Sequence, residues 1–332
     1  MSRSLDKDLL ARLKADDPNV VYKDISTILT DVTDGELLEI EFLGRSHPLE
    51  PGVNYLKDGP AIAIPKLKLA QAFFVARRIL QKYQEGDHMK ATDVIVATAV
   101  LLLMDPEHLT AANTRKRLLV SILETSKPDE STLRREQQFV DSLLTSRLYR
   151  HAKSPTLWSH RRWLLGLLTA NGIIIDPQQD INSIVMVAGI RHPRNYPAWH
   201  HARFLLDHCP RLAGTIAVDV KEFCLKNHTD ISSWSFLIYA VSKIEDRDSR
   251  CKVSSSIFAD VLSITDSLRW TNETVWVFLR NMMAANPVYK QQFESFFAVN
   301  KKLASTVPED GDQLRTLDNA RYWCEKYCFG IA

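Results

Sequence analysis

Hydrophobic residues recur at intervals of three and four along most of the chain, which is the period of an amphipathic helix. Residues 65–85 have a wide apolar face with lysines and arginines between its members. Residues 92–104 form a second apolar stretch, and Thr92 suits its N-cap. From Asp105 onward helical stretches alternate with short breaks, and most breaks contain a proline, which fits the first turn of a helix but not its interior. Strand signals are scarce, so the sequence predicts an all-α fold.

A tryptophan-centred segment repeats along the chain. It is clearest as Asn195-Tyr-Pro-Ala-Trp199-His-His-Ala-Arg203, and it recurs around three other tryptophans. The four tryptophans are Trp158, Trp199, Trp234 and Trp276, with spacings of 41, 35 and 42 residues. An earlier copy lies around Ala112, where alanine stands in place of tryptophan. A period of this size is typical of stacked helical hairpins, each of which buries its apolar face against the next.

The residue types within each copy indicate a structural role before they indicate a chemical one. A short polar residue such as Asn195 or Asp230 stands four residues before the tryptophan and suits a helix N-cap. The tryptophans are expected to pack in the core. Basic residues follow three and four positions later, on the same helical face. They are Arg115, Lys116, Arg161, Arg162, Arg203 and Arg280. We expect them to line one rim of the array or, at Arg161 and Arg162, to hold an interhelical carboxylate.

The composition is that of an ordinary globular protein, with 45% hydrophobic and 25% charged residues among 332. The formal net charge is +2, from 42 basic and 40 acidic residues, which argues against a partner that is nucleic acid or a membrane surface. Five cysteines without framework spacing indicate reduced thiols in a cytoplasmic protein. The N-terminus has no apolar signal core, and the longest apolar run, Val94 to Met104, is shorter than the roughly 20 residues of a membrane span.

Two regions follow from these patterns. Residues 1–60 form an irregular N-terminal segment, with one short helix expected over residues 5–14 and a break at Pro48. Residues 61–332 are predicted to form the helical-repeat domain, which contains a small polar insertion at residues 126–136. The repeats are centred near residues 112, 158, 199, 234 and 276.

The sequence contains no self-contained active site. It has no glycine-rich phosphate loop, no nucleophile elbow and no His or Cys group with zinc-site spacing. His200 and His201 are adjacent, so on a helix they point about 100° apart and do not easily share one ion. Cys324 and Cys328 lie four residues apart without a nearby histidine, and we expect buried thiols there. The sequence therefore predicts no metal bound by this chain.

The pattern of Asn-Tyr, Trp and Arg, at this period and with prolines at the helix starts, resembles the protein prenyltransferase α-subunit repeat. The resemblance covers residues 105–285, and four tryptophans in phase make it specific. Tetratricopeptide repeats share the hairpin form but lack this Trp–Arg block. Within the family, the segments around Ala112 and Lys153 are similar to a diverged α-type chain rather than to the farnesyltransferase or Rab α subunits.

The resemblance implies an architecture, a partner and substrates. The architecture is a right-handed superhelical crescent (an α–α solenoid) of helical hairpins that wraps around a prenyltransferase β subunit, here of the Rab geranylgeranyltransferase type. The β subunit carries the zinc and most of the isoprenoid pocket, so no cofactor is expected on this chain. The substrates are an isoprenoid diphosphate, geranylgeranyl rather than farnesyl, and a protein with a C-terminal cysteine.

The resemblance also indicates candidate site residues. The family's catalytic lysine stands five residues before the tryptophan of the second repeat, and Lys153 occupies that position. Its ammonium would stabilise the charge that develops on the leaving diphosphate. Arg194 holds the equivalent position in the third repeat, and Tyr196 completes an intact Asn-Tyr pair there. These two residues and Arg161 are expected near the diphosphate or the peptide. After Lys153, however, Ser154-Pro155 replaces the family's Asn-Tyr.

We therefore expect the α-type subunit of a heterodimeric protein prenyltransferase that is active only with a β subunit and transfers an isoprenoid to a protein cysteine. One alternative is a non-catalytic helical-repeat scaffold that kept the array and lost the chemistry. Pro155 and Ala112 favour that alternative, because both depart from the repeat. The other alternative is a peptide-binding interaction protein with a concave groove and no barrel-shaped partner.

Overall fold

The computed structural model describes residues 17–30, 35–44, 47, 49–125, 130–285 and 290–328. This part of the chain is mostly helical, in agreement with the predicted all-α class. It divides into two compact units, Met1–Ile175 (unit 1) and Asp176–Ala332 (unit 2). The helix expected over residues 5–14, the break at Pro48 and the first half of the polar insertion lie wholly or partly outside the described residues.

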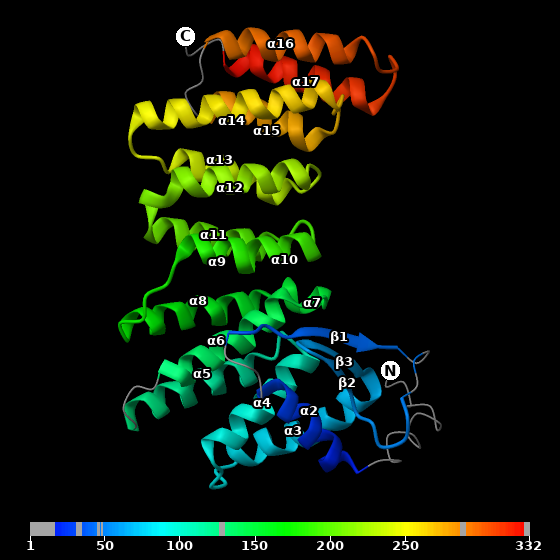
Figure 1. Cartoon of the computed structure of the whole chain (residues 1–332), viewed down its shortest axis with the longest axis vertical. Helices are drawn as coiled ribbons and strands as arrows, with labels where there is room; N and C mark the ends of the chain where they lie inside the picture. Colours follow the sequence, from blue (N-terminus) through cyan, green and yellow to red (C-terminus); the bar gives the residue numbers. More distant parts are fainter. Residues whose placement is uncertain are drawn as a thin grey trace. The chain divides into compact units, whose positions relative to one another are not determined.

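Unit 1 begins with a helix and a small sheet, and helices form the rest of its described part (Figure 1). Its elements are α2 (Pro18–Thr30), β1 (Glu39–Leu43), β2 (Leu56–Asp58), β3 (Ala61–Pro65), α3 (Lys66–Gln84), α4 (Ala91–Met104), α5 (Leu109–Thr125), α6 (Glu130–Thr145), α7 (Tyr149–Ala152) and α8 (Pro155–Ala170). Helix α4 packs against α2, α3 and α5, and α8 packs against α5 and α6. Because α4 has neighbours on several sides, its sequence is apolar almost all round.

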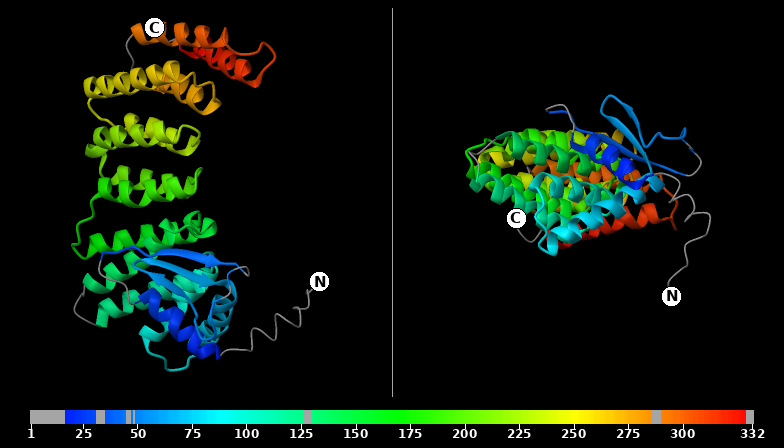
Figure 2. Two further views of the ribbon diagram at one scale, coloured as in Figure 1. Left: turned by 45° about the vertical axis from the view of Figure 1, so that its right-hand side comes forward. Right: turned by 90° about the horizontal axis from the view of Figure 1, so that it is seen from below.

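The sheet is a feature that the sequence analysis did not predict. β3 pairs in parallel with β1 and antiparallel with β2, which gives the order β1-β3-β2 (Figure 2). Ile62 and Ile64 of β3 are buried and alternate with alanines. A two-residue loop joins β2 to β3, and Gly59 in it has a φ of +55°, as a type II′ hairpin turn requires at its first central position. The usable signal was therefore Gly59-Pro60 followed by an alternating segment.

Unit 2 is helical wherever it has regular structure among its described residues. Its elements are α9 (Pro177–Asp180), the π-helical turn η1 (Ile181–Val185), α10 (Met186–Arg191), α11 (Tyr196–His208), the 3-10 turn η2 (Pro210–Leu212), α12 (Ala213–Lys226), α13 (Ile231–Ser242), α14 (Arg247–Ser267), α15 (Glu273–Ala285), α16 (Lys290–Ala304) and α17 (Asp312–Tyr327). α11, α13, α15 and α17 contact one another in that order, and α12, α14 and α16 do the same. The hairpins of this unit therefore stack in two layers (Figure 1). The handedness and curvature of the expected crescent stay predictions.

The four repeat tryptophans lie in the core, each at most 2% exposed. Three of them donate the indole N–H to the backbone carbonyl oxygen six residues earlier. These bonds are Trp158 to Ala152 (2.9 Å), Trp234 to His228 (3.1 Å) and Trp276 to Trp270 (2.9 Å). The bond ties the first turn of each repeat helix to the connection before it.

Trp199 makes a different set of contacts. Its indole nitrogen is buried without a hydrogen-bond partner. Its ring packs against Phe223 and Phe236, with centroid distances of 5.3 Å in both cases. Gly189 of α10 lies beside this cluster, and a Cβ there would be 3.1 Å from the Phe223 ring. Glycine at this position therefore allows α10 to approach the aromatic cluster closely.

Candidate functional site

Lys153 stands at the junction between α7 and α8, and a dense set of backbone contacts fixes the start of α8. Ser154 is the N-cap of α8. Its hydroxyl accepts a hydrogen bond from the N–H of Leu157 (3.0 Å) and donates one to the carbonyl oxygen of Pro106 (3.1 Å). Pro155 takes the first helical position, where no N–H is needed. Ser154 and Pro155, which depart from the Asn-Tyr of the repeat that the sequence resembles, therefore form a well-capped helix start.

The short helix α7 before Lys153 is also held in place. Trp158 donates its indole N–H to the carbonyl of Ala152, the residue next to Lys153. His151 is buried, and its Nε2 lies 2.8 Å from the carbonyl oxygen of Leu103. Burial lowers the pKa of His151 to about 4, although hydrogen bonds to backbone carbonyls partly oppose this. The ring is therefore neutral at pH 7 and donates its Nε2–H to the carbonyl.

The side chain of Lys153 is partly exposed and lies against an aromatic ring. Its ammonium is 4.6 Å from the centroid of the Tyr149 ring, which is within the roughly 6 Å of a cation–π contact. Tyr149 is itself 62% exposed. Sequence reasoning noted the missing tyrosine after Lys153 but overlooked this one, which stands one turn earlier. The structure thus places a lysine and a tyrosine together at the surface of unit 1.

Arg194 and Tyr196 belong to unit 2, where they flank the N-cap of α11. Arg194 has a left-handed φ of +60°, and its backbone N–H donates to Oδ1 of Asp230 at 3.2 Å. Its side chain is exposed, and Tyr196 is 61% exposed. Asn195 between them is buried and caps α11 by accepting from the N–H of Ala198 at 3.3 Å. The expected joint role of Lys153 with these residues stays a prediction.

Arg161 is fully buried, unlike a residue on an exposed rim. Its Nε donates to Oδ1 of Asp141 at 2.6 Å, and its Nη2 donates to Oδ2 at 3.3 Å. Arg161 on α8 therefore holds an interhelical carboxylate on α6, which is the second of the two roles that the sequence left open. With its guanidinium inside the core, it is not available to a diphosphate in this structure.

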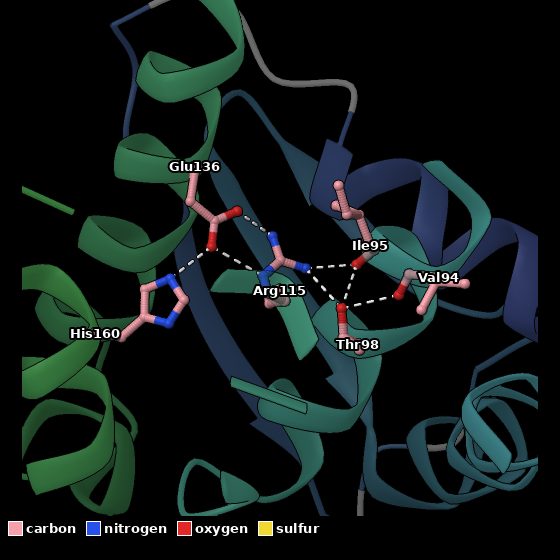
Figure 3. Close-up of polar contacts among 6 residues, drawn as sticks. All are labelled: Val94, Ile95, Thr98, Arg115, Glu136 and His160. Carbon is pink, nitrogen blue, oxygen red and sulfur yellow. Dashed lines mark hydrogen bonds and ion pairs between the residues drawn. The ribbon is translucent and has the colours of Figure 1, made fainter. Parts of the chain in front are cut away.

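Arg115, the corresponding residue of the first repeat, is buried in the same way (Figure 3). Its Nε donates to Oε1 of Glu136 at 2.9 Å and its Nη2 donates to Oε2, so the pair is bidentate. His160 lies 2.8 Å from the same Oε1. Burial alone would raise the pKa of Glu136, but the charge of Arg115 and the hydrogen bonds from His160 and Arg115 outweigh it and lower the pKa to about 2. Glu136 is therefore ionised at neutral pH.

Helix α6 thus supplies a carboxylate to each of two repeats. Glu136 pairs with Arg115 of α5, and Asp141, five residues later, pairs with Arg161 of α8. The expectation of an exposed rim position is wrong for Arg115, because it is paired with a buried acid, whereas the pair of Arg161 is the interhelical alternative that the sequence left open. The signal that sequence reasoning missed is the spacing of the two acids along α6.

The basic residues four positions after Ala112 and Trp199 contact aromatic rings and not buried carboxylates. Lys116 lies with its Nζ 5.4 Å from the Trp163 ring, and Arg203 has its Cζ 5.3 Å from the Tyr239 ring. Trp163 and Tyr239 both stand five residues after the tryptophan of the following repeat. Burial lowers the pKa of Lys116 and of Arg203. These cations therefore join neighbouring repeats by stacking on aromatic rings.

The described residues contain no group of three or more His, Cys, Asp or Glu side chains suited to a metal ion. The zinc expected on a partner subunit is not tested by this chain. All five cysteines are free, and Cys324 and Cys328 are buried as expected. Within the same described ranges, none of the helices is both long and apolar enough to cross a membrane.

These features define a helical-repeat protein with buried tryptophans at four repeat centres and two buried arginine–carboxylate pairs in unit 1. Residues 135–168 match the protein prenyltransferase alpha subunit repeat, and residues 157–263 match the ECM9 middle domain. The first match contains Lys153, Trp158 and Arg161, so the resemblance drawn from the repeat pattern is confirmed over this segment. A comparison with curated proteins returned no match.

Proposed function

We propose that this chain is the α-type subunit of a heterodimeric protein prenyltransferase of the Rab geranylgeranyltransferase type, acting in the cytoplasm. In this proposal a β subunit provides the zinc and the isoprenoid pocket, and Lys153 provides positive charge at the leaving diphosphate. The observation that supports it most is the setting of Lys153. A partly exposed ammonium stands at a rigid helix junction inside the segment that matches the prenyltransferase alpha repeat.

The reaction accounts for the requirement for a cation. The sulfur of a substrate cysteine thiolate forms a bond to C1 of the isoprenoid while the bond between C1 and the diphosphate oxygen breaks. The diphosphate leaves with the bonding electron pair, so negative charge grows on it in the transition state. An ammonium held in place beforehand stabilises that charge more than it stabilises the ground state. In this scheme Arg194 and Tyr196 contact the diphosphate or the peptide, and Tyr149 orients the ammonium of Lys153.

The test is a transfer assay with the chain reconstituted with a Rab-type β subunit. We expect Lys153→Ala to lower kcat by roughly 10²- to 10³-fold, as the loss of one electrostatic stabiliser does in other enzymes. Lys82→Ala, at an exposed lysine of α3, is the matched control and should leave kcat unchanged. An unchanged kcat for Lys153→Ala in an active heterodimer would show that the proposed catalytic role is wrong.

A non-catalytic scaffold is the second candidate, and one observation favours it. In two repeats the arginine three positions after the centre is buried and pairs with a carboxylate on α6. If the basic residues of the repeats only stabilise the fold, the chain can be stable without catalysing a reaction. The scaffold is the better description if the chain folds alone and does not co-purify with any prenyltransferase β subunit when the two are co-expressed.

A further inference from the structure

Unit 1 contains a cavity of about 670 Å³ that Lys153 does not line. This volume falls within the roughly 300–1,000 Å³ that is typical of small-molecule sites. Helices α2, α4, α5 and α6 form its walls. The wall is largely apolar and includes Leu29, Ile95, Val96, Leu119, Ile122 and Phe139. The cavity therefore has the size and lining of a ligand site, outside the region proposed for prenyl transfer.

Part of the apolar wall is left uncovered. Ile95 and Val96 stand in α4 and keep partial solvent exposure, although their neighbours Val94 and Ala97 are fully buried. Ile122 of α5 is also partly exposed. Covering such side chains with an apolar ligand is favourable, because it removes their surface from water. The wall thus suits a hydrocarbon chain.

The cavity is lined by two cationic side chains. Lys90 and Arg135 are both exposed, and neither forms an ion pair with another described residue. Lys90 is also the N-cap of α4 but provides no side-chain cap, so the first-turn N–H groups lack such a partner. Ala91 and Thr92 of that turn also line the cavity. Lys90 at the start of this 14-residue helix and Arg135 of α6 therefore favour an anion in the cavity, and Asp93, the acidic residue of the first turn, does not line it.

The acid in the cavity wall does not oppose an anion. Glu136 lines the cavity, but its carboxylate is neutralised by the bidentate contact with Arg115 (Figure 3). Arg115 also donates from Nη1 to the hydroxyl of Thr98 at 3.1 Å and to the carbonyl of Ile95. The network fixes the wall on the α4 side, so the pocket is largely formed before any ligand binds.

We infer that this cavity binds a single-chain amphipathic molecule. Its apolar chain lies along Ile95, Val96 and Ile122, and its anionic head, a carboxylate or a phosphate, lies at Lys90 and Arg135. This inference does not depend on the proposed transfer reaction, because neither Lys153 nor a β subunit takes part in it.

The test is equilibrium dialysis of the full chain with radiolabelled palmitate in one arm and geranylgeranyl phosphate in the other, both below their micelle concentrations. We expect one equivalent to bind in at least one arm. Val96→Trp fills the cavity and should abolish binding. The double variant Lys90→Glu/Arg135→Glu should weaken binding about tenfold or more, because like charges then face the head. Arg78→Glu/Lys82→Glu changes the net charge equally on exposed positions of α3 and should leave binding unchanged.

The outcomes separate the possibilities. Binding of palmitate alone assigns a carboxylate head, and binding of geranylgeranyl phosphate alone assigns a phosphate head. The inference is overturned if neither ligand binds, or if binding survives Val96→Trp in a chain with an unchanged circular dichroism spectrum. If Val96→Trp does not fold, the surface double variant decides, and equal affinity of that variant and its α3 control overturns the inference.

Discussion

Trp158 donates its indole N–H to the carbonyl oxygen of Ala152 across 2.9 Å, and this bond joins the repeat helix to the residue before Lys153. Trp199 stands at the same position of the next repeat, yet its indole nitrogen is buried without a partner. Both rings are in the core, and of the two only Trp158 makes this bond, although Trp199 also packs against Phe223 and Phe236. The chain therefore contains its own control for the contribution of the bond.

We predict that Trp158→Phe destabilises the chain by about 1–2 kcal/mol more than Trp199→Phe. Phenylalanine leaves the buried carbonyl of Ala152 without its donor in the first variant, whereas no bond is lost in the second. Urea denaturation of the two variants beside the wild type measures the difference in the free energy of unfolding. Equal losses would mean that the indole hydrogen bond of Trp158 adds no measurable stability beyond the packing of its ring.

The burial of the tryptophans could be predicted from the sequence, because the repeat period, the helix start and the aromatic residue all indicate a core position. The partners of the basic residues could not be predicted. Arg115 and Arg161 pair with acids 21 and 20 residues away, respectively, and periodicity identifies the helices but not which carboxylate reaches which arginine. An exposed rim and a buried pair require the same residue types at the same helical positions. Only the tertiary packing, which brings Glu136 of α6 to Arg115 and Asp141 of α6 to Arg161, distinguishes them.

The second prediction concerns the buried pair of Arg115 and Glu136. Arg115→Met should destabilise unit 1 by about 3–5 kcal/mol, because it leaves an uncompensated charge in the core. Arg115→Met/Glu136→Leu should recover most of this loss, because no charge then remains buried. Arg134→Ala breaks an exposed ion pair with Glu130 and should cost about 0.5 kcal/mol or less. Urea unfolding of the three variants measures these values.

A double variant as unstable as Arg115→Met would contradict this account. It would place the main contribution of Arg115 in its bonds to α4 rather than in its charge.

The third prediction is a loss of stability in mild acid that depends on His151. Its pKa is 6.5 when unperturbed and about 4 in the folded chain, since burial disfavours the charged ring. The unfolded chain thus takes up a proton at a higher pH than the folded chain does. Stability is therefore full above pH 6.5 and falls as the pH falls toward 4. Between pH 7 and pH 5 the loss should be about 2 kcal/mol, at about 1.4 kcal/mol per pKa unit.

His151→Gln keeps a donor for the backbone carbonyl but does not titrate, so its free energy of unfolding should change much less over this range. Urea denaturation of both proteins at pH 7 and pH 5 tests this. Glu136 does not confuse the result, because its pKa is lowered to about 2 and its contribution is lost only below about 4.5. Parallel losses in both proteins would assign the acid sensitivity to another group.

The fourth prediction separates conformation from charge at Arg194. Arg194 and Arg269 both have a left-handed φ, of +60° and +53°, and both side chains are exposed. Glycine adopts this region without strain but loses more entropy on folding, so each Arg→Gly change should alter stability by about 1 kcal/mol or less. If Arg194 contacts the diphosphate, Arg194→Gly lowers prenyl transfer in the reconstituted heterodimer and Arg269→Gly does not. Equal transfer rates would remove Arg194 from the site.

The region before α3 shows where pattern reasoning reached its limit. Residues 61–65 form β3 with two buried isoleucines, but five residues are too few for a period of two to be distinguished from a helical stretch. The Gly59-Pro60 loop, with glycine at its first position, was the stronger signal. For Lys153 the limit was different. Its position in the repeat could be counted, whereas the tyrosine beside it, Tyr149, comes from α7, a four-residue helix whose existence depends on tertiary contacts.

Asp230 accepts hydrogen bonds from the backbone of two successive repeats. One of its oxygens caps α13 through the N–H of Ser232 at 3.0 Å, and the same oxygen holds the Arg194 turn before α11. Opening either helix start would break a hydrogen bond to this buried carboxylate. The two hairpins should therefore exchange their amide hydrogens as a single cooperative block instead of fraying one at a time. A repeat array held together in this way resists local unfolding in its middle, so we expect opening to begin at its ends.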